Sequence, residues 1–226
     1  TNDSGRGSLR EAIQTAQTGD AILSDPAVSL ANPSAPSFTN ALHLQSPERS
    51  TLTGASAYRN TSSLAQLPPS TTKLVALDNV WRYNQSGVDL GTAWKEPGYD
   101  DSAWPSGRGV LAVEDNPAVT PLVNTVLSLT NAAGQRVITY YFRTKVVLSQ
   151  DPESIYLTVS NLVDDGAVVY VNGVEVYRQN MPSGPITAST LASAAAVEGQ
   201  FLVHYLPGTV LRLGTNVVAV EVHQWS

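Results

Sequence analysis

The sequence feature that most constrains the fold is Asn172-Gly173, which lies between two runs of β-branched and aromatic residues. An Asn-Gly pair favours a type I′ turn, because both central residues of that turn need a positive φ. Residues 167–171 before it and 174–177 after it are both typical of strands. Asp164-Asp165-Gly166 predicts a second turn, which returns the chain from a strand at 154–160. We therefore predict three consecutive antiparallel strands, with the middle one central in a sandwich because it is apolar on both faces.

Similar strand-like segments recur from residue 73 onward, each bounded by Gly, Pro, Asn or Asp. The predicted strands are 73–77, 80–83, 137–148, 155–160, 167–171, 174–178, 200–205 and 216–223. The segment 137–148 is long enough to bend across a sandwich, and 189–197 fits either one or two helical turns or irregular chain. These segments predict an all-β fold, an antiparallel β-sandwich of about eight strands.

The N-terminal part of the chain has a different pattern. Ser8 and Glu11 have the spacing of a capping box, and apolar residues then recur at helical spacing up to Gly19, which predicts a short helix over 9–18. Such a short helix is not stable alone, so its apolar stripe is expected to dock on another part of the protein.

Residues 24–72 are rich in Ser, Thr, Ala, Asn and Pro. The prolines interrupt every candidate element and leave only two weak strands, at 41–44 and 50–53. We therefore place a domain boundary near 67–72. The predicted domains are 1–71, a capping helix with an irregular arm or linker, and 72–226, the β-sandwich.

Composition excludes several classes of function. The formal net charge is −6 over 226 residues, and the absence of a Lys/Arg cluster argues against binding to nucleic acid. No apolar run approaches the roughly 18 residues of a membrane span. The chain has no cysteine, which fits either a reducing cytosol or a bacterial secreted protein with a large core. Because it begins at Thr1 with neither Met nor a signal peptide, we expect a mature or excised piece.

Two acidic pairs are the candidate metal ligands: Asp100 with Asp101, and Asp164 with Asp165. Neighbouring carboxylates can bind Ca²⁺ or act as acid and base. Each pair also stands at a turn beside Gly or Ser, where Asp hydrogen-bonds its own backbone, so turn building and Ca²⁺ binding are alternatives. Neither pair lies in an EF-hand loop, and no cofactor other than Ca²⁺ is expected.

The three histidines, His43, His204 and His223, do not have the spacing of a zinc site. We expect structural roles for them, and keep His223, which precedes Gln224 and Trp225, as a candidate ligand contact. The sequence has no GxSxG nucleophile elbow, and its Gly-Arg-Gly motifs lack the lysine and the helix of a phosphate loop. We therefore expect no enzymatic activity.

Four segments resemble, in this order, galactose-binding-like jelly-roll modules. They are WRYNQSGVDLGTAWKEPGYDDSAWPSGRGVL (81–111), TYYFRTKVVL (139–148), NLVDDGAVVYVNGVEVYRQNMPSGPI (161–186) and LGTNVVAVEVHQ (213–224). VYVNG with the later GTNVVAVEV also resembles the sugar-binding domain that precedes the catalytic barrel of β-galactosidase-type enzymes. The jelly-roll resemblance covers roughly 74–226 and implies fold more strongly than ligand.

Such modules stand beside phosphoesterase, glycosidase and surface-anchoring domains in large secreted bacterial proteins. The resemblance therefore implies a secreted or cell-surface location and a carbohydrate or cell-surface polymer as partner. Residues 2–22, NDSGRGSLREAI followed by TGDAI, also resemble the N-terminal cap of secreted bacterial β-helix proteins, without the strand ladder that follows it there.

Modules of this type usually continue past the VEVHQ strand with one more strand, whereas this chain stops at Ser226. We therefore expect an open sheet edge beside 216–223, filled by the N-terminal arm, by another chain or by nothing. An open edge is a template for pairing, so neighbouring domains or chains are the expected partners of this C-terminal edge strand.

The aromatic residues between 81 and 104 are the strongest indication of a ligand site. The resemblance implies that Trp81 and Trp104 pack in the core. Trp94 and Tyr99 are predicted to face a ligand, because a flat ring packs under the apolar face of a sugar while nearby polar groups bind its hydroxyls. The predicted ligand-binding residues are Trp94, Tyr99, Arg178, Asn180 and His223.

Two functions are consistent with the sequence. The first is a non-catalytic accessory module that binds a carbohydrate or targets a substrate, which the aromatic loop favours. The second is a structural or adhesive domain of a large surface protein or fibre, whose open sheet edge pairs with another chain.

Overall fold

The computed structural model of the protein describes residues 37–45 and 71–226, with only the backbone at 37–45 and at Thr71. All of these residues belong to one compact unit, Ser34–Ser226. The strands are β1 Ser37–Gln45, β2 Thr71–Val75, β3 Val80–Asn84, β4 Ser106–Arg108, β5 Leu111–Ala112, β6 Thr125–Val126, β7 Thr139–Leu148, β8 Tyr156–Asp164, β9 Gly166–Val171, β10 Val174–Gln179, β11 Phe201–Pro207 and β12 Gly214–His223. Helix in these residues is limited to short 3-10 segments, η1 Ala93–Lys95, η2 Thr120–Leu122, η3 Pro152–Ser154 and η4 Gly208–Val210. The predicted all-β class is confirmed.

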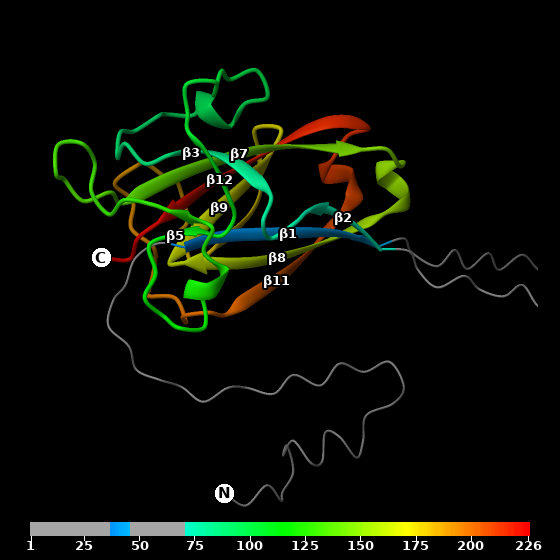
Figure 1. Cartoon of the computed structure of the whole chain (residues 1–226). Coiled ribbons are helices and arrows are strands. Elements are labelled where there is room, and N and C mark those ends of the chain that lie inside the picture. The colour runs from blue at the N-terminus through cyan, green and yellow to red at the C-terminus, as the bar shows by residue number, and fades with distance from the viewer. Residues whose placement is uncertain (1–36, 46–70) are drawn as a thin grey trace, which may run out of the picture. The chain divides into compact units, whose positions relative to one another are not determined.

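The strands form two six-stranded sheets (Figure 1). Sheet A has the order β11-β8-β1-β5-β6, and β2 also pairs with β1. Sheet B has the order β10-β9-β12-β7-β3-β4. The described pairs are antiparallel except for the two-residue strands β5 and β6, which run parallel.

The hairpin between β9 and β10 is formed as predicted. Asn172 and Gly173 have φ values of 51° and 88°, as the two central residues of a type I′ turn require. Val171 pairs with Val174 directly across the turn. Every residue of β9 is buried, and the strand lies between β10 and β12, so its predicted central position is confirmed.

The prediction of three consecutive antiparallel strands is wrong, because β8 and β9 lie in different sheets. The chain crosses from sheet A to sheet B at Asp164-Asp165-Gly166 instead of reversing within one sheet. Gly166 fits this crossing because a Cβ there would lie 2.6 Å from Met181 Sδ and 2.7 Å from Asn180 O. A turn motif in sequence cannot distinguish a hairpin from a crossover between layers.

The two sheets share one apolar core. Sheet B contributes the inward side chains of β7, β9 and β12, and sheet A contributes those of β8. The largest fully buried apolar members include Trp81, Tyr140, Phe142, Leu111, Leu148 and Leu157. The predicted core position of Trp81 is confirmed, since only 1% of its surface is exposed.

A second apolar layer covers the opposite face of sheet B. Its buried members are Trp94, Trp104, Tyr141, Val168, Tyr170 and Ala219, and Leu90, Tyr99, Met181 and Ile186 pack against them. The segment between β3 and β4 therefore acts as a lid on this sheet, which explains why β9 and β12 are apolar on both faces.

The predicted open edge beside 216–223 is wrong. β12 pairs with β7 along its whole length and with β9 on its other side. Eight consecutive residues of β12, Asn216 to His223, are buried, as expected of a central strand.

Several other predictions concern the N-terminal part and the loops. The weak strand predicted at 41–44 is part of β1, which lies inside sheet A between β8 and β5. The predicted helix at 9–18, the strand at 50–53 and the resemblance over 2–22 lie outside the described residues. Of the two alternatives for residues 189–197, the structure has irregular chain, with a turn ending at Ser189 and a bend at 193–194. β7 stays within sheet B without bending across the layers.

Candidate ligand-binding groove

Trp94, the first of the predicted ligand contacts, is a core residue. It is 1% exposed, and its ring packs against Tyr141 at 4.7 Å and edge-on against Tyr170 at 5.7 Å between ring centroids. Its carbonyl oxygen accepts a hydrogen bond from the buried guanidinium of Arg143. The prediction that Trp94 faces a ligand is therefore not supported, because its ring is buried against Tyr141 and Tyr170 of sheet B.

Tyr99 is half-buried and packs edge-on against Trp104, with 5.7 Å between ring centroids. The Arg143 guanidinium lies 5.4 Å from the centre of the Tyr99 ring, within cation–π range. Arg143 Nε also donates to Asp101 Oδ2 at 2.7 Å. Tyr99 thus helps to enclose a buried cation, and Asp101 pairs with that cation.

Arg178 and Asn180 hold loops together. Arg178 makes a bidentate pair with Glu175, with N–O distances of 2.6 and 2.8 Å, and also donates to the backbone oxygen of Pro182 at 2.6 Å. The hydrogen bond to Glu175 raises the pKa of Arg178 and lowers the pKa of Glu175. Asn180 Nδ2 donates to the backbone oxygens of Asp165 at 3.1 Å and Ala194 at 2.6 Å.

His223 is fully buried and does not line a surface site. Its Nδ1 lies 2.9 Å from Thr139 Oγ1 and 2.7 Å from the backbone oxygen of Thr190. Its Nε2 lies 3.4 Å from Glu221 Oε2, and the other oxygen of Glu221 accepts a hydrogen bond from Tyr170 Oη at 2.6 Å. Burial first, and then the Glu221 charge, raise the pKa of Tyr170. These buried polar side chains connect β7, β9 and β12 of sheet B.

The acidic pairs have structural contacts instead of a shared metal site. Asp100 Oδ1 accepts from Ser102 N at 3.0 Å, and hydrogen bonds from Ser102 lower the pKa of Asp100, as expected for a turn-building residue. Asp165 Oδ1 accepts from Ala196 N and its Oδ2 from Trp225 N, both at 2.8 Å. Within residues 71–226, no three acidic, histidine or cysteine side chains form a group that could hold a metal ion.

Asp164 is a buried carboxyl group with an unusual protonation state. It is 4% exposed, and its Oδ2 has no hydrogen-bond partner among the described residues. The pKa of Asp164 is raised to about 10, and burial is the largest cause. The neighbouring Asp165 carboxylate and the charges of Glu198 and Glu114 raise it further. Asp164 is therefore protonated at neutral pH.

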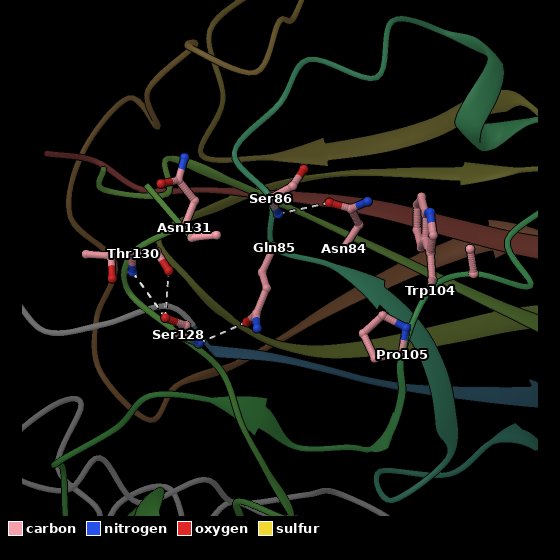
Figure 2. Close-up of a pocket in the computed structure, with 10 residues that line it drawn as sticks. Asn84, Gln85, Ser86, Trp104, Pro105, Ser128, Thr130 and Asn131 are labelled. Carbon is pink, nitrogen blue, oxygen red and sulfur yellow. Dashed lines mark hydrogen bonds between the residues drawn. The ribbon is translucent and has the colours of Figure 1, made fainter. Parts of the chain in front are cut away.

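An open groove lies elsewhere, where three loops meet at one end of sheet B (Figure 2). Its volume is ≈ 510 Å³, within the range of about 300–1,000 Å³ typical of small-ligand sites. The lining residues are Asn84, Gln85, Ser86, Ala103, Trp104, Pro105, Ser128, Thr130, Asn131 and Ala132. None of the residues predicted to bind a ligand is among them.

Strand pairing brings these loops together. Asn84 ends β3 and pairs with Tyr141 near the start of β7, so the loop after β3 lies beside the loop that precedes β7. Arg82 pairs with Ser106 at the start of β4, which places Trp104 and Pro105 at the same end of the sheet. In sheet B, β3 lies between β7 and β4, so the three loops meet where these neighbouring strands end.

Hydrogen bonds fix the walls of the groove. Gln85 Oε1 accepts from Ser128 N at 2.9 Å and so joins the first loop to the second (Figure 2). Ser128 Oγ donates to the backbone oxygen of Thr130 at 2.7 Å, and Asn131 Oδ1 accepts from Gln135 N at 3.0 Å. The Arg82 guanidinium donates to the backbone oxygen of Trp104 at 2.7 Å and so fixes the third loop, which carries Trp104 and Pro105.

The polar groups of the groove are uncharged, and some of them form no hydrogen bond within the described residues. Its lining contains amides and hydroxyls but no Asp, Glu, Lys, Arg or His. Among the residues the structure describes, Asn84 Nδ2, Gln85 Nε2 and Thr130 Oγ1 make no hydrogen bond, while Asn84 Oδ1 already accepts from Ser86 N at 2.9 Å. Trp104 is 7% exposed and adds an apolar edge to the wall. The groove therefore suits an uncharged ligand with several hydroxyl groups.

Sequence reasoning missed this groove because its residues are ordinary loop residues. Two signals were present: the position of Asn84, Gln85 and Ser86 directly after a predicted strand that ends at 83, and Trp104, which belongs to the aromatic cluster but is predicted as a core residue. Polar residues at strand ends are common in turns, so the first signal alone does not distinguish a groove from a loop.

A second surface is the outer face of β11, the outermost described strand of sheet A. Phe201, Val203 and Tyr205 alternate along it and are 41%, 49% and 74% exposed. Tyr156 of β8, which is 55% exposed, pairs with Pro207 at the end of β11. These residues form an exposed apolar stripe along a sheet edge.

Comparison of the chain with protein-family models, with curated proteins and with solved structures returned no match. No helix in the described part of the chain has the length and apolar character needed to cross a membrane.

Proposed function

We propose that this chain is a non-catalytic, galactose-binding-like jelly-roll module of a secreted or cell-surface bacterial protein, and that it binds a neutral carbohydrate in the groove. The observation that carries the proposal is the lining of amides and hydroxyls beside Trp104 and Pro105. Free donors at Asn84, Gln85 and Thr130 match the hydroxyl groups of a sugar, and Trp104 offers an apolar contact.

The same lining supports binding over catalysis. General acid–base chemistry needs a titratable side chain within reach of the reacting group, and none of the ten lining residues is titratable. The uncharged lining also favours a neutral sugar over a phosphorylated or acidic one, because an anion needs cationic or backbone donors.

Calorimetric titration with neutral di- and trisaccharides of glucose, galactose and N-acetylglucosamine tests the proposal. Thr130→Val removes one exposed hydroxyl from the groove and keeps the side-chain shape. We expect the affinity for the sugar that binds to fall about threefold to tenfold, as for the loss of one hydrogen bond worth roughly 0.5–1.5 kcal/mol.

Thr209→Val is the matched control, because Thr209 is exposed and lies in η4, outside the groove. Equal affinities in the two variants would contradict the assignment of the groove, and absence of binding to every sugar tested would contradict carbohydrate binding.

The exposed stripe on β11 supports a second candidate function, a structural or adhesive domain that pairs with other chains. An edge strand with exposed apolar side chains is a template for association. If this surface is used, Val203→Lys lowers the association measured by analytical ultracentrifugation, while Val147→Lys, at another exposed valine, leaves it unchanged. A chain that is monomeric at high concentration before any substitution argues against this function.

A further inference from the structure

β1 has a special place in sheet A. It pairs with β8 over its nine residues on one side, and with β2 and β5 on the other side. In the described residues, β8 has no other sheet neighbour than β1 and β11. Among the described strands, β1 is therefore the only one that pairs with both the β11-β8 part of the sheet and the β2-β5-β6 part.

The position that β1 fills, between β8 on one side and β2 and β5 on the other, is here called the strand slot. The register places positions 38, 42 and 44 of β1 opposite Val163, Val159 and Leu157, which are buried in the shared core. An empty slot would leave the inner edge of β8 without hydrogen-bond partners and would open the core beside it. The fold thus needs a strand in this position.

The connections of β1 are much longer than those of a hairpin. Residues 46–70 separate Gln45 from Thr71, although these two residues pair directly in the sheet. A chain of this length can span at most about 80 Å at roughly 3.3 Å per residue. By contrast, β9 and β10 are joined by only the two residues Asn172 and Gly173, too short a connection for one of them to pair in a second copy while the other stays in the first.

We propose that the strand slot also accepts Ser37–Gln45 from a second copy of this chain, so that two copies exchange β1 reciprocally. The exchanged strand has the same sequence and register, so each slot keeps the backbone hydrogen bonds of the monomer. Because each copy supplies one strand and one slot, the exchange closes as a two-fold dimer. Residues 46–70 provide enough chain length for β1 to reach the slot of a second copy, and protein concentration sets the balance between monomer and dimer.

The absence of cysteine from the chain allows a clean cross-linking test on the full-length protein. Ala41 and Ser160 are register partners across β1 and β8. Two single variants, Ala41→Cys and Ser160→Cys, are mixed at high concentration, oxidised mildly and analysed by non-reducing electrophoresis and mass spectrometry. Ser102→Cys, at an exposed loop position, replaces Ser160→Cys in the control mixture and measures random collision.

We expect a disulfide-linked heterodimer of Ala41→Cys with Ser160→Cys, in clear excess over the control and increasing with concentration. A heterodimer yield equal to the control overturns the proposal. A second pair, Gln45→Cys with Tyr156→Cys, tests the same register at the C-terminal end of β1 and guards against a local defect in folding. A dimer in which neither of these two disulfides forms under oxidation must use another surface, and this result also contradicts strand exchange.

Discussion

Arg143 of β7 holds the lid, the segment between β3 and β4, against sheet B. It is 1% exposed, its Nε pairs with Asp101, and its Nη1 donates to the backbone oxygens of Trp94 and Glu96. A buried cation needs such partners, since its desolvation is costly without them. This arrangement holds Trp94 against the sheet as a core residue, although the sequence analysis predicts that its ring faces a ligand.

Trp94→Ala tests the core assignment. Removal of a fully buried indole leaves a cavity, so we expect the free energy of unfolding to fall by about 3–5 kcal/mol, measured by urea denaturation. Trp225→Ala is the control, because Trp225 is 44% exposed, and its effect is expected to be much smaller. A loss of sugar affinity in folded Trp94→Ala without a loss of stability would show that the indole contacts ligand after all.

Asp164 predicts a specific pH dependence of stability. Its pKa is raised from 3.8 to about 10 in the folded state, so the folded chain keeps a proton that the unfolded chain loses. The stabilising contribution of this proton is complete below pH ~4 and declines as the pH rises towards 10, by at most about 1.4 kcal/mol per pH unit.

Asp164→Asn carries no titratable proton at this position, and we expect its unfolding free energy to decline less steeply than that of the parent between pH 5 and pH 9. Asp115→Asn, at an exposed carboxylate, serves as the control. Identical slopes in the parent and Asp164→Asn would contradict the buried, protonated carboxyl.

At the scale of elements, the β9–β10 hairpin depends on its two turn residues. Gly173 has a φ of 88°, a conformation that residues with a Cβ rarely adopt. β9, the strand before the turn, is fixed by its pairing with β12 and is buried over its whole length, whereas β10 pairs only with β9 among the described strands. The turn therefore determines the register of β10, an edge strand of the described sheet B.

Gly173→Ala is expected to lower the free energy of unfolding by about 1–2 kcal/mol, because the added Cβ strains the left-handed conformation. The nearest atoms to that Cβ belong to the flexible carboxylate of Glu96, which can move away, so the backbone strain dominates. Gly98→Ala, where a Cβ would meet no atom within 4 Å, is the control and should change stability much less. Equal effects would refute the turn assignment.

The strands were predictable where their side chains alternate or remain apolar over several residues, as in β9 and β12. The strands β4, β5 and β6 were not, because two or three residues carry too little pattern. The crossover at Asp164-Asp165-Gly166 was read as a hairpin, since the sheet to which each flanking strand belongs depends on partners distant in sequence. For the same reason the edge expected at β12 is a central position.

At the scale of the whole described unit, the candidate site arises from topology. The loops that carry Gln85, Ser128 and Trp104 are distant in sequence and meet because β3 pairs with both β4 and β7. No local motif marks this meeting point, whereas the aromatic cluster that did stand out in the sequence became the lid on sheet B. We therefore propose that the ligand binds in the uncharged groove at the end of sheet B, where Trp104 of the second apolar layer forms part of the wall.

The most direct test of this account is a ¹H–¹⁵N NMR titration of the full chain with the neutral saccharide that binds best. The account predicts that the largest shift changes occur at the side-chain amides of Asn84 and Gln85, the backbone amides of Ser128 and Thr130, and the indole N–H of Trp104. Changes centred on Arg178 and Asn180, with the groove signals unmoved, would contradict it.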